Sequence, residues 1–361
     1  MTPQVGIAGW IGAGNVGDEL LLRVTAQELR RVDLEPVALS RDPARTEREH
    51  GMEAIPHVLW PGNGRALSGL VFGGGGLVQD RSSPWSPLFQ LHRPWEASRR
   101  RLPTVAIGLG AEPLRWPTSR SATRAGLRRC LEVVTRDEPS ARTIEPLVRR
   151  QPVPAADLAF LLPRPSCVPK DVIVVSLVGP GSAAGIVPAS FRAPARPDPA
   201  LVDRWAAELD QLAGALNCRL ELLSMHPERD APWHQAIAGA IGERARAIDA
   251  QVDTVIDVIG SARLVIAERF HAGVLALHLD VPVVGVAYAR KVADLLVPIA
   301  GPGVLFDGLQ GDGDLEPVAT RQLDAQQHLR VAGAVASLRE AAARNRRPLE
   351  LLSRAISERG R

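Results

Sequence analysis

The sequence predicts an α/β protein built from two Rossmann-like, doubly wound domains. Short apolar runs alternate with amphipathic stretches along the chain, which is typical of parallel βαβ units. Several of the apolar runs end directly in glycines or polar residues, as strands do where a parallel sheet meets its ligand. A proline-rich break at about 161–170 divides the pattern into two halves, and 361 residues suffice for two domains.

The first apolar run, 5–10, leads into the stretch 12–19, Gly-Ala-Gly-Asn-Val-Gly-Asp-Glu, and then into a helix pattern that extends to about Arg31. This order predicts a strand, a tight turn, and a helix whose first N–H groups face a ligand. The stretch contains G-x-G-x-x-G, so a dinucleotide site is one interpretation. Asp18 and Glu19 would repel a pyrophosphate; they suit an N-cap and first helical turn, or a hydroxyl-rich ligand such as a sugar. Glycines needed only for the turn are the third interpretation.

Further strands of the first half are expected at 35–40, 70–72, 104–109 and 131–135. The run 70–72 ends in four glycines, which offer a second place where a ligand can contact backbone. Gln79 and Asp80 follow these glycines, and a flexible turn capped by Asp80 is the alternative. Arg136 follows the strand 131–135, where a guanidinium can bind an anion or pair with a nearby carboxylate.

The second half shows the same alternation of strand and helix patterns, with strands expected at 171–176, 219–225, 264–267 and 281–286. Two sheets with facing carboxyl edges would form a cleft, which is the GT-B-like arrangement. We expect an N-terminal domain at 1–165 and a C-terminal domain at 166–320. The tail, 321–361, carries no strand pattern, and we expect its helices to pack back on the N-terminal domain.

Composition excludes several classes of protein. The formal net charge of +3 does not indicate nucleic-acid binding, although arginines crowd between Arg93 and Arg150 and would suit an anionic substrate or a solvated face. Three widely spaced cysteines argue against a disulfide framework or a zinc site, and the sequence shows no metal cluster. Without a signal peptide or a membrane-length apolar run, a cytoplasmic protein is expected. The oligomeric state is left open.

Five short motifs occur in a fixed order: 14–19, 73–80, 136–140, 269–272, and Tyr288 with Lys291. Together they resemble the polysaccharide pyruvyl transferase family, in particular its bacterial CsaB-like branch, over roughly 5–300. The resemblance implies a GT-B-like fold and transfer of pyruvate from phosphoenolpyruvate to a sugar as a ketal. In cell-wall members the modified sugar is where S-layer proteins attach. Arg290 departs from the pattern, because a neutral or acidic residue is expected beside the lysine.

The donor suggested by this resemblance carries a phosphate and a carboxylate, so its site needs several fixed cations. Arg136, Arg269 and Lys291, each just past an expected strand, are the candidates. His271 is the candidate general acid–base, because histidine titrates near neutral pH. A helix-start histidine bonded to backbone is the alternative, and His226 is a weaker second candidate.

The acceptor sugar is expected on the N-terminal domain and the donor on the C-terminal domain. Asp18 could act as a general base toward a sugar hydroxyl. The other acceptor or loop residues are Gly14, Asn15, Gly17, Gly74, Gly75, Gln79 and Asp80. Trp10 or Trp85 could stack on a sugar or simply pack.

Beyond the donor no cofactor is expected, and a lipid-linked acceptor would bring the protein to a membrane surface. Two other functions remain open: a GT-B glycosyltransferase that uses a nucleotide sugar, and a sugar-binding protein without catalysis.

Overall fold

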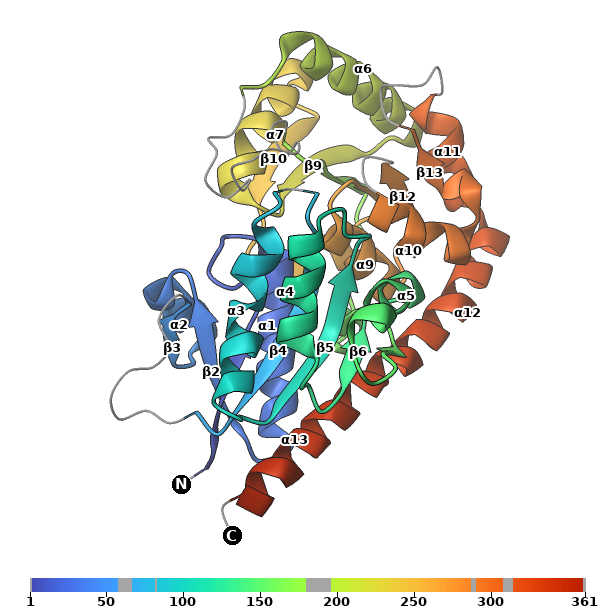
Figure 1. Ribbon diagram of the computed structural model, residues 1–361. Helices are drawn as coiled ribbons and strands as arrows, with labels where there is room; N and C mark the ends of the chain where they lie inside the picture. Colours follow the sequence, from blue (N-terminus) through green and yellow to red (C-terminus); the bar gives the residue numbers. More distant parts are fainter. Residues whose placement is uncertain are drawn as a thin grey trace. The chain divides into compact units, whose positions relative to one another are not determined.

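The computed structural model describes residues 2–57, 67–81, 83–179, 196–286, 290–307 and 314–359. These residues divide into two compact units, each of which is considered by itself (Figure 1). The first unit comprises the described residues up to Leu162 and those from Leu338 onward. The second comprises the described residues between Pro163 and Ser337. Tyr288 and residues 180–195 lie outside the described part of the chain.

The first unit is organised around a parallel sheet with the order β3-β2-β1-β4-β5-β6-β7. The order reverses direction between β1 and β4, which is the switch point of a doubly wound sheet. Its strands are largely apolar and buried, because helices cover both faces. They are β1 Gln4–Ala8, β2 Glu35–Ser40, β3 Ala54–Pro56, β4 Gly69–Val78, β5 Thr104–Ala111, β6 Val133–Thr135 and β7 Val153–Pro154.

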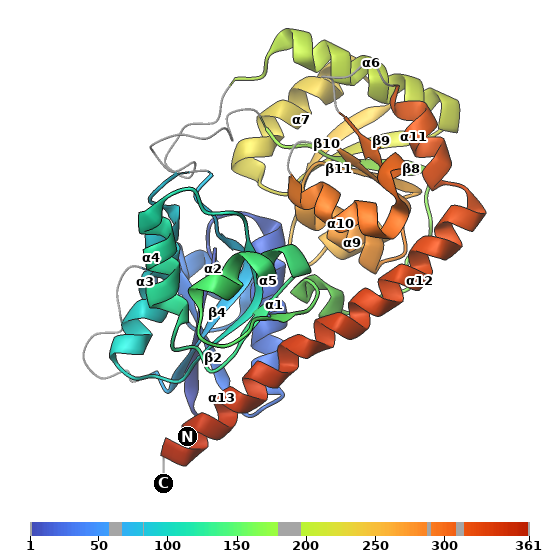
Figure 2. The ribbon, with the colours of Figure 1, turned by 45° about the vertical axis from the view of Figure 1, so that its right-hand side comes forward.

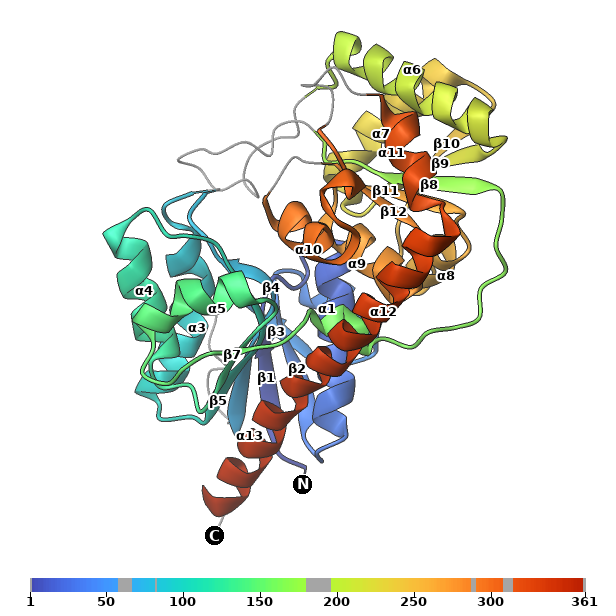
Figure 3. The same ribbon diagram turned by 90° about the vertical axis from the view of Figure 1, so that its right-hand side faces the viewer.

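Two pairs of helices cover the faces of this sheet. Helices α3 (Ser86–Arg99) and α4 (Pro117–Leu127) lie side by side on one face, and α1 (Val16–Arg30) and α13 (Arg346–Arg359) lie on the other (Figure 3). Gly126 allows α4 close to Leu91 of α3, since an added Cβ would come within 3.1 Å of that side chain. The remaining helices of the first unit are α2 Pro43–His50, α5 Glu138–Ile144, η1 Glu145–Leu147 and η2 Leu158–Leu161.

The second unit repeats the strand order, as β10-β9-β8-β11-β12-β13, with every pair parallel (Figure 2). Its strands are β8 Val172–Ser176, β9 Arg219–Ser224, β10 Ala245–Asp249, β11 Leu264–Ala267, β12 Val283–Val286 and β13 Leu305–Phe306. Its helices are α6 Pro199–Leu216, α7 Pro227–Ile241, α8 Val255–Gly260, α9 Phe270–His278, α10 Arg290–Ala300, η4 Pro302–Val304 and α11 Leu315–Gln322. The switch point lies between β8 and β11. The fold class predicted from the sequence, two Rossmann-like α/β domains, is confirmed.

The C-terminal helices belong to both units. Helix α12 (Ala325–Ala342) begins in the second unit and ends in the first, and η6 (Ala343–Asn345) and α13 follow. Asn345 is buried and joins the tail to the sheet: its Oδ1 accepts from the N–H of Gly108 at 2.8 Å, and its Nδ2 donates to the carbonyl of Ala156 at 3.1 Å. Leu352 of α13 packs at the start of β4. The last helix is therefore part of the first unit's core.

The end expected for the strand at 70–72 needs correction. Gly73–Gly76 do not follow a short strand but lie inside β4, which continues to Val78. Positive φ at Gly73, Gly74 and Gly75 lets the strand bend and keep its pairing with β5, with a register shift between Gly75 and Val78. A Cβ at Gly73 would come 1.9 Å from the carbonyl oxygen of Ile107, so only glycine allows the two strands this approach.

The expected strand 219–225 is followed directly by α7, with His226 as the N-cap, because Pro227 suits a first helical position. The strands that were not predicted are β3, β7, β10 and β13, which are the edge strands of the two sheets. No helix among the described residues is both long and apolar enough to span a bilayer.

Candidate functional site

The glycine-rich turn after β1 leads directly into α1, as predicted. Asn15 is the N-cap: its Oδ1 accepts from the N–H of Gly17 at 3.2 Å, and its Nδ2 donates to Asp18 Oδ2 at 2.6 Å. Gly12 and Gly14 have positive φ, which the turn requires. The cap thus orients the Asp18 carboxylate at the carboxyl edge of the sheet.

Glu19 has a different role from Asp18. It is buried, and its Oε1 accepts from the N–H of Gly12 at 2.8 Å while its Oε2 lies 3.0 Å from His50 Nε2. The carboxylate thereby holds the glycine turn against α2. Glu19, Glu49 and His50 are also close enough to share a metal ion, a grouping that their sequence spacing did not suggest. The hydrogen bonds of Glu19 explain its burial without one.

Glycines from β4 and β5 leave room for two charged side chains. A Cβ at Gly75 would come 2.8 Å from Asp18 Oδ1, so the carboxylate lies directly on this glycine. A Cβ at Gly110 would come 2.7 Å from the guanidinium of Arg136, which lies over β5 near Gly76. The Nε of the buried Arg136 donates to Asp137 at 3.0 Å. Asp18 and Arg136 therefore both lie at the carboxyl edge of the first sheet, against glycine backbone.

Gln79 and Asp80 both form hydrogen bonds within the first unit. Gln79 donates to Ser86 Oγ at 3.3 Å. Asp80 is buried, and its Oδ2 accepts from the N–H groups of Arg115 and Trp116 at 2.8 and 2.9 Å, which holds the entry to α4. These bonds join Asp80 to a distant segment, and its predicted contact with the acceptor stays a prediction.

An aromatic and basic cluster at the ends of β1, β2 and β3 was missed by the sequence analysis. The Arg41 guanidinium lies 4.7 Å from the centre of the Trp10 ring and 5.5 Å from that of Phe89. His57 lies 5.0 Å from Phe89 and 5.1 Å from His92, centre to centre. Burial and the nearby His92 lower the pKa of His57 to about 3, so it is neutral at physiological pH. Trp10 is thus packed in contact with a cation.

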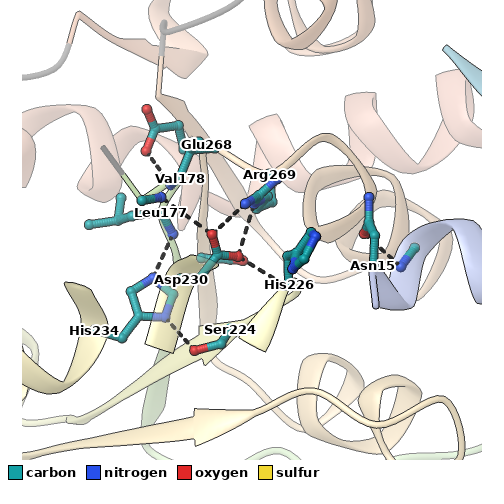
Figure 4. Close-up of polar contacts among 12 residues, drawn as sticks. Asn15, Leu177, Val178, Ser224, His226, Asp230, His234, Glu268 and Arg269 are labelled. Atoms are coloured by element: carbon teal, nitrogen blue, oxygen red, sulfur yellow. Dashed lines mark hydrogen bonds and ion pairs between the residues drawn. The ribbon is translucent and has the colours of Figure 1, made fainter. Parts of the chain in front are cut away.

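In the second unit, the centre of the arrangement is an ion pair between the buried Asp230 of α7 and the partly buried Arg269, which follows β11 (Figure 4). Arg269 donates to both carboxylate oxygens, through Nε at 3.0 Å and through Nη2. The same carboxylate accepts from the N–H groups of His226 at 2.9 Å and Gly179 at 3.3 Å. Asp230 therefore joins the ends of β8, β9 and β11 and fixes the arginine's orientation.

Glu268, the residue before this arginine, accepts from the N–H of Val178 at 2.6 Å (Figure 4). Burial raises the pKa of Glu268 to about 7, against the opposing effects of that hydrogen bond and of Arg269. A carboxyl group that titrates near neutral pH is suited to proton transfer. Glu268 was not among the residues predicted for the site, although it directly precedes the motif 269–272.

Two histidines in this unit are held neutral. His234 is fully buried: its Nε2 accepts from the N–H of Leu177 at 3.2 Å, so Nδ1 donates to Ser224 Oγ at 3.0 Å. Burial lowers the pKa of His234 to about 4. The pKa of His226 is also lowered to about 4, mainly by burial and to a lesser extent by the positive charge of Arg269. The Nδ1 of His226 is buried and has no hydrogen-bond partner among the described residues.

His271 and Lys291 meet around Phe270, the first residue of α9. The imidazole packs edge-on at 5.4 Å from the Phe270 ring, and Lys291 Nζ lies 5.9 Å from the centre of that ring. His271 lies at a helix start, as predicted, but it is buried there. Arg269, His271 and Lys291 thus share one edge of the second sheet. Arg136 and Asp18 belong to the first unit, and an anion site shared by Arg136 with Arg269 stays a prediction.

Comparisons with known proteins agree with this architecture. The family model described as polysaccharide pyruvyl transferase matches residues 15–290. No curated protein gives a significant match. Solved structures with the GT-B fold match almost the whole chain. A UDP-N-acetylglucosamine 2-epimerase from Rickettsia bellii has a TM-score of 0.63 at 12% identity and covers 99% of this chain and 98% of its own.

Two other structures show the same fold. HepE from Anabaena, in complex with UDP and glucose, has a TM-score of 0.54 at 12% identity, with 99% of both chains covered. MurG from Acinetobacter baumannii has a TM-score of 0.53 at 13% identity, with 97% of this chain and 99% of its own covered. At such identities these likenesses show the fold alone.

Proposed function

This chain belongs to the polysaccharide pyruvyl transferase family, and we propose that it transfers pyruvate from phosphoenolpyruvate to a sugar of a cell-wall or exopolysaccharide precursor. The observation that carries the proposal is the group Arg269, His271 and Lys291 on one edge of the second unit, within the stretch that the family model matches or directly beside it. The group combines two cations with a titratable side chain, which is what an anionic donor and a proton transfer require.

In the proposed reaction, a proton adds to the methylene carbon of phosphoenolpyruvate and leaves an oxocarbenium-like centre at C2. One sugar hydroxyl attacks this carbon and loses its proton. A second hydroxyl of the same sugar then replaces the phosphate, so the products are a cyclic ketal and inorganic phosphate. The chemistry needs cations for the donor and at least one group that both accepts and donates protons.

Arg269 is the proposed donor-binding residue with the best-defined geometry. Asp230 binds its Nε and Nη2, so the planar guanidinium is held at a fixed angle. We propose that its remaining donor edge binds the carboxylate or phosphate of the donor, with Lys291 as a second cation. Arg136 is the third proposed donor ligand.

His271 remains the proposed general acid–base, and the structure adds Glu268 as a second candidate. The pKa of Glu268 is about 7, so the protonated and the ionised carboxyl are both populated at neutral pH. On the first unit, Asp18 beside Gly75 is the proposed contact for acceptor hydroxyls. The backbone of Gly14, Gly17 and Gly74 is proposed to contact the acceptor as well. A lipid-linked acceptor, a CsaB-like role in S-layer anchoring and a cytoplasmic location are parts of the same proposal.

A GT-B glycosyltransferase that uses a nucleotide sugar is the second candidate, because the matching structures include one in complex with UDP and glucose. Thermal shift separates the two functions. A donor that binds only the native state at a hundred times its Kd stabilises the protein by about 2.7 kcal/mol. We expect phosphoenolpyruvate to raise Tm and UDP- or GDP-sugars to leave it unchanged.

A Tm shift by a nucleotide sugar, with none by phosphoenolpyruvate, would contradict the proposal. The product is then identified by mass spectrometry of a panel of lipid-linked and nucleotide-linked sugars that have been incubated with phosphoenolpyruvate.

A further inference from the structure

We propose that the outer surface of α3 and α4 in the first unit docks on the headgroup region of an anionic lipid bilayer. The inference rests on exposed side chains and charge, and it stands apart from the pyruvyl transfer chemistry.

Large apolar side chains are exposed on this surface to an unusual degree. Six large hydrophobic residues are exposed among the described residues, and four of them fall between residues 85 and 116. They are Trp85 (58% exposed), Leu88 (42%), Trp95 (43%) and Trp116 (51%). Three are tryptophans, whose amphipathic indole rings concentrate at membrane–water interfaces.

The helical spacing places these side chains on one face. Trp85, Leu88 and Trp95, with Arg99, follow one another at intervals of three, seven and four residues, which is a single stripe along α3. The Arg99 guanidinium lies 5.0 Å from the centre of the Trp95 ring. The opposite side of α3 carries its buried residues and packs on the sheet (Figure 1). The stripe therefore faces away from the core.

Helix α4 adds a row of positive charge beside this stripe. Arg120, Arg124 and Arg128 are exposed and four residues apart, so they stand above one another on one helix face. The guanidinium groups of Arg124 and Arg128 form no hydrogen bond or ion pair with any described residue, although the two backbones are bonded to each other within the helix. Like charges at this spacing destabilise a helix, so folding alone does not explain the row.

The charge of this region differs from that of the rest of the chain. Residues 81–130 contain ten arginines and two glutamates, a net charge of +8. The whole chain is only +3, so the remaining residues together carry −5. Basic side chains interleaved with tryptophan and leucine are typical of surfaces that lie in the interface of an anionic bilayer. A second copy of the same face is a poor partner, because two such faces repel each other.

Vesicle flotation of the full chain tests the proposal. We expect the protein to float with phosphatidylcholine vesicles that contain phosphatidylglycerol, to float much less with phosphatidylcholine alone, and to be released at high ionic strength. Arg124→Ala with Arg128→Ala should lower the partition coefficient about 25-fold, or about fivefold per arginine. Leu88→Ala with Trp116→Ala should lower it about tenfold or more.

Matched control variants distinguish the effect of this surface from the effect of removing exposed arginines or apolar side chains elsewhere. Arg48→Ala with Arg354→Ala removes two exposed arginines on α2 and α13, and Val168→Ala with Leu329→Ala removes two exposed apolar side chains of the second unit. Both controls should float like the unmodified protein. Turnover with a water-soluble acceptor should be unchanged in every variant, which keeps this proposal separable from that of the enzymatic activity.

The proposal is overturned if no anionic vesicle binds the protein, or if the surface and control variants lose binding equally. Tight binding of DNA or of an anionic polysaccharide that depends on the arginines but not on Trp116 would also overturn it and identify a soluble polyanion as the partner. So would a self-association, measured by analytical ultracentrifugation, that Leu88→Ala with Trp116→Ala abolishes.

Discussion

The carboxyl edges of the two sheets can be compared directly, because both sheets have the same strand order around their switch point. In the first unit, glycines of β4 and β5 leave room at this edge for two charged side chains, Asp18 against Gly75 and Arg136 over Gly110. Each bonds to a residue close to it in the sequence, Asp18 to Asn15 and Arg136 to Asp137. At the carboxyl edge of the second unit, the polar groups are bonded to one another: Asp230 binds Arg269 and accepts from two backbone N–H groups.

The difference shows two ways to prepare one topology for a ligand. Glycines let a ligand approach the backbone, and the charged side chains beside them bond mainly to neighbours in the sequence. An ion pair with shared hydrogen bonds holds a cation rigidly, but the arrangement is lost when any one of the bonded groups is removed. We therefore expect substitutions in the second unit to have larger effects than substitutions in the first.

The largest effect is expected for His271→Gln. Glutamine keeps hydrogen bonding but cannot titrate, and loss of a general acid–base costs about two to four decades in rate. Turnover, measured by phosphate release with the correct acceptor, should fall by that factor, while donor affinity in calorimetry changes little. His328→Gln on α12 is the control. Near-normal turnover of His271→Gln would move the proton-transfer role to Glu268 or His226.

The next largest effect is expected on stability, for Asp230→Ala. The variant leaves the Arg269 guanidinium without its ion-pair partner and deprives two N–H groups of their acceptor, so it should lower the free energy of unfolding by about 3–5 kcal/mol. Asp210→Ala breaks an exposed pair with Arg244 and should cost about 1 kcal/mol or less. Denaturant titration measures both. Equal losses in the two variants would show that Asp230 does not organise the second unit's edge.

Glu268→Gln should change how stability depends on pH. The folded state raises the pKa of this carboxyl from 4.5 to about 7, so between these values the unfolded chain is ionised while the folded chain stays protonated. The favourable contribution of the protonated carboxyl is full below pH 4.5 and is lost as pH rises through 7.

Unmodified protein and variant should therefore have similar stabilities at low pH. The stability advantage of the variant should grow as pH rises from 4.5 to 7 and then level off at about 3 kcal/mol. Urea titrations across this pH range provide the measurement. An advantage that is constant with pH would contradict the raised pKa.

The smallest effect is expected in the first unit, for Gly110→Ala. The added methyl would come 2.7 Å from the guanidinium of Arg136, whose flexible side chain can move away. Stability should change by about 1 kcal/mol or less, while the affinity for phosphoenolpyruvate falls about tenfold if Arg136 is a donor ligand. Gly239→Ala on α7, where no described atom lies within 4 Å of the new methyl, is the control. Unchanged donor affinity in Gly110→Ala would remove Arg136 from the proposed site.

Much of the first unit's edge could be predicted from the sequence, because its chemistry depends on neighbours in the chain. The turn at Gly12–Gly17, the cap by Asn15 and the helix after it all follow from local rules of glycine and capping residues. Arg269 and His271 could be placed at a helix start for the same reason. The family resemblance rested on these same local motifs.

The sequence by itself therefore determined the class of fold, the family and the positions of the charged residues at strand ends, because alternating apolar runs and glycine turns act over a few residues. Only the tertiary structure decided which of these residues meet and what state they adopt. Asp230 pairs with Arg269 although 39 residues separate them, and Glu268 acquires its pKa of about 7 from burial. Burial and cross-strand pairing depend on how distant segments pack, and no local pattern records them.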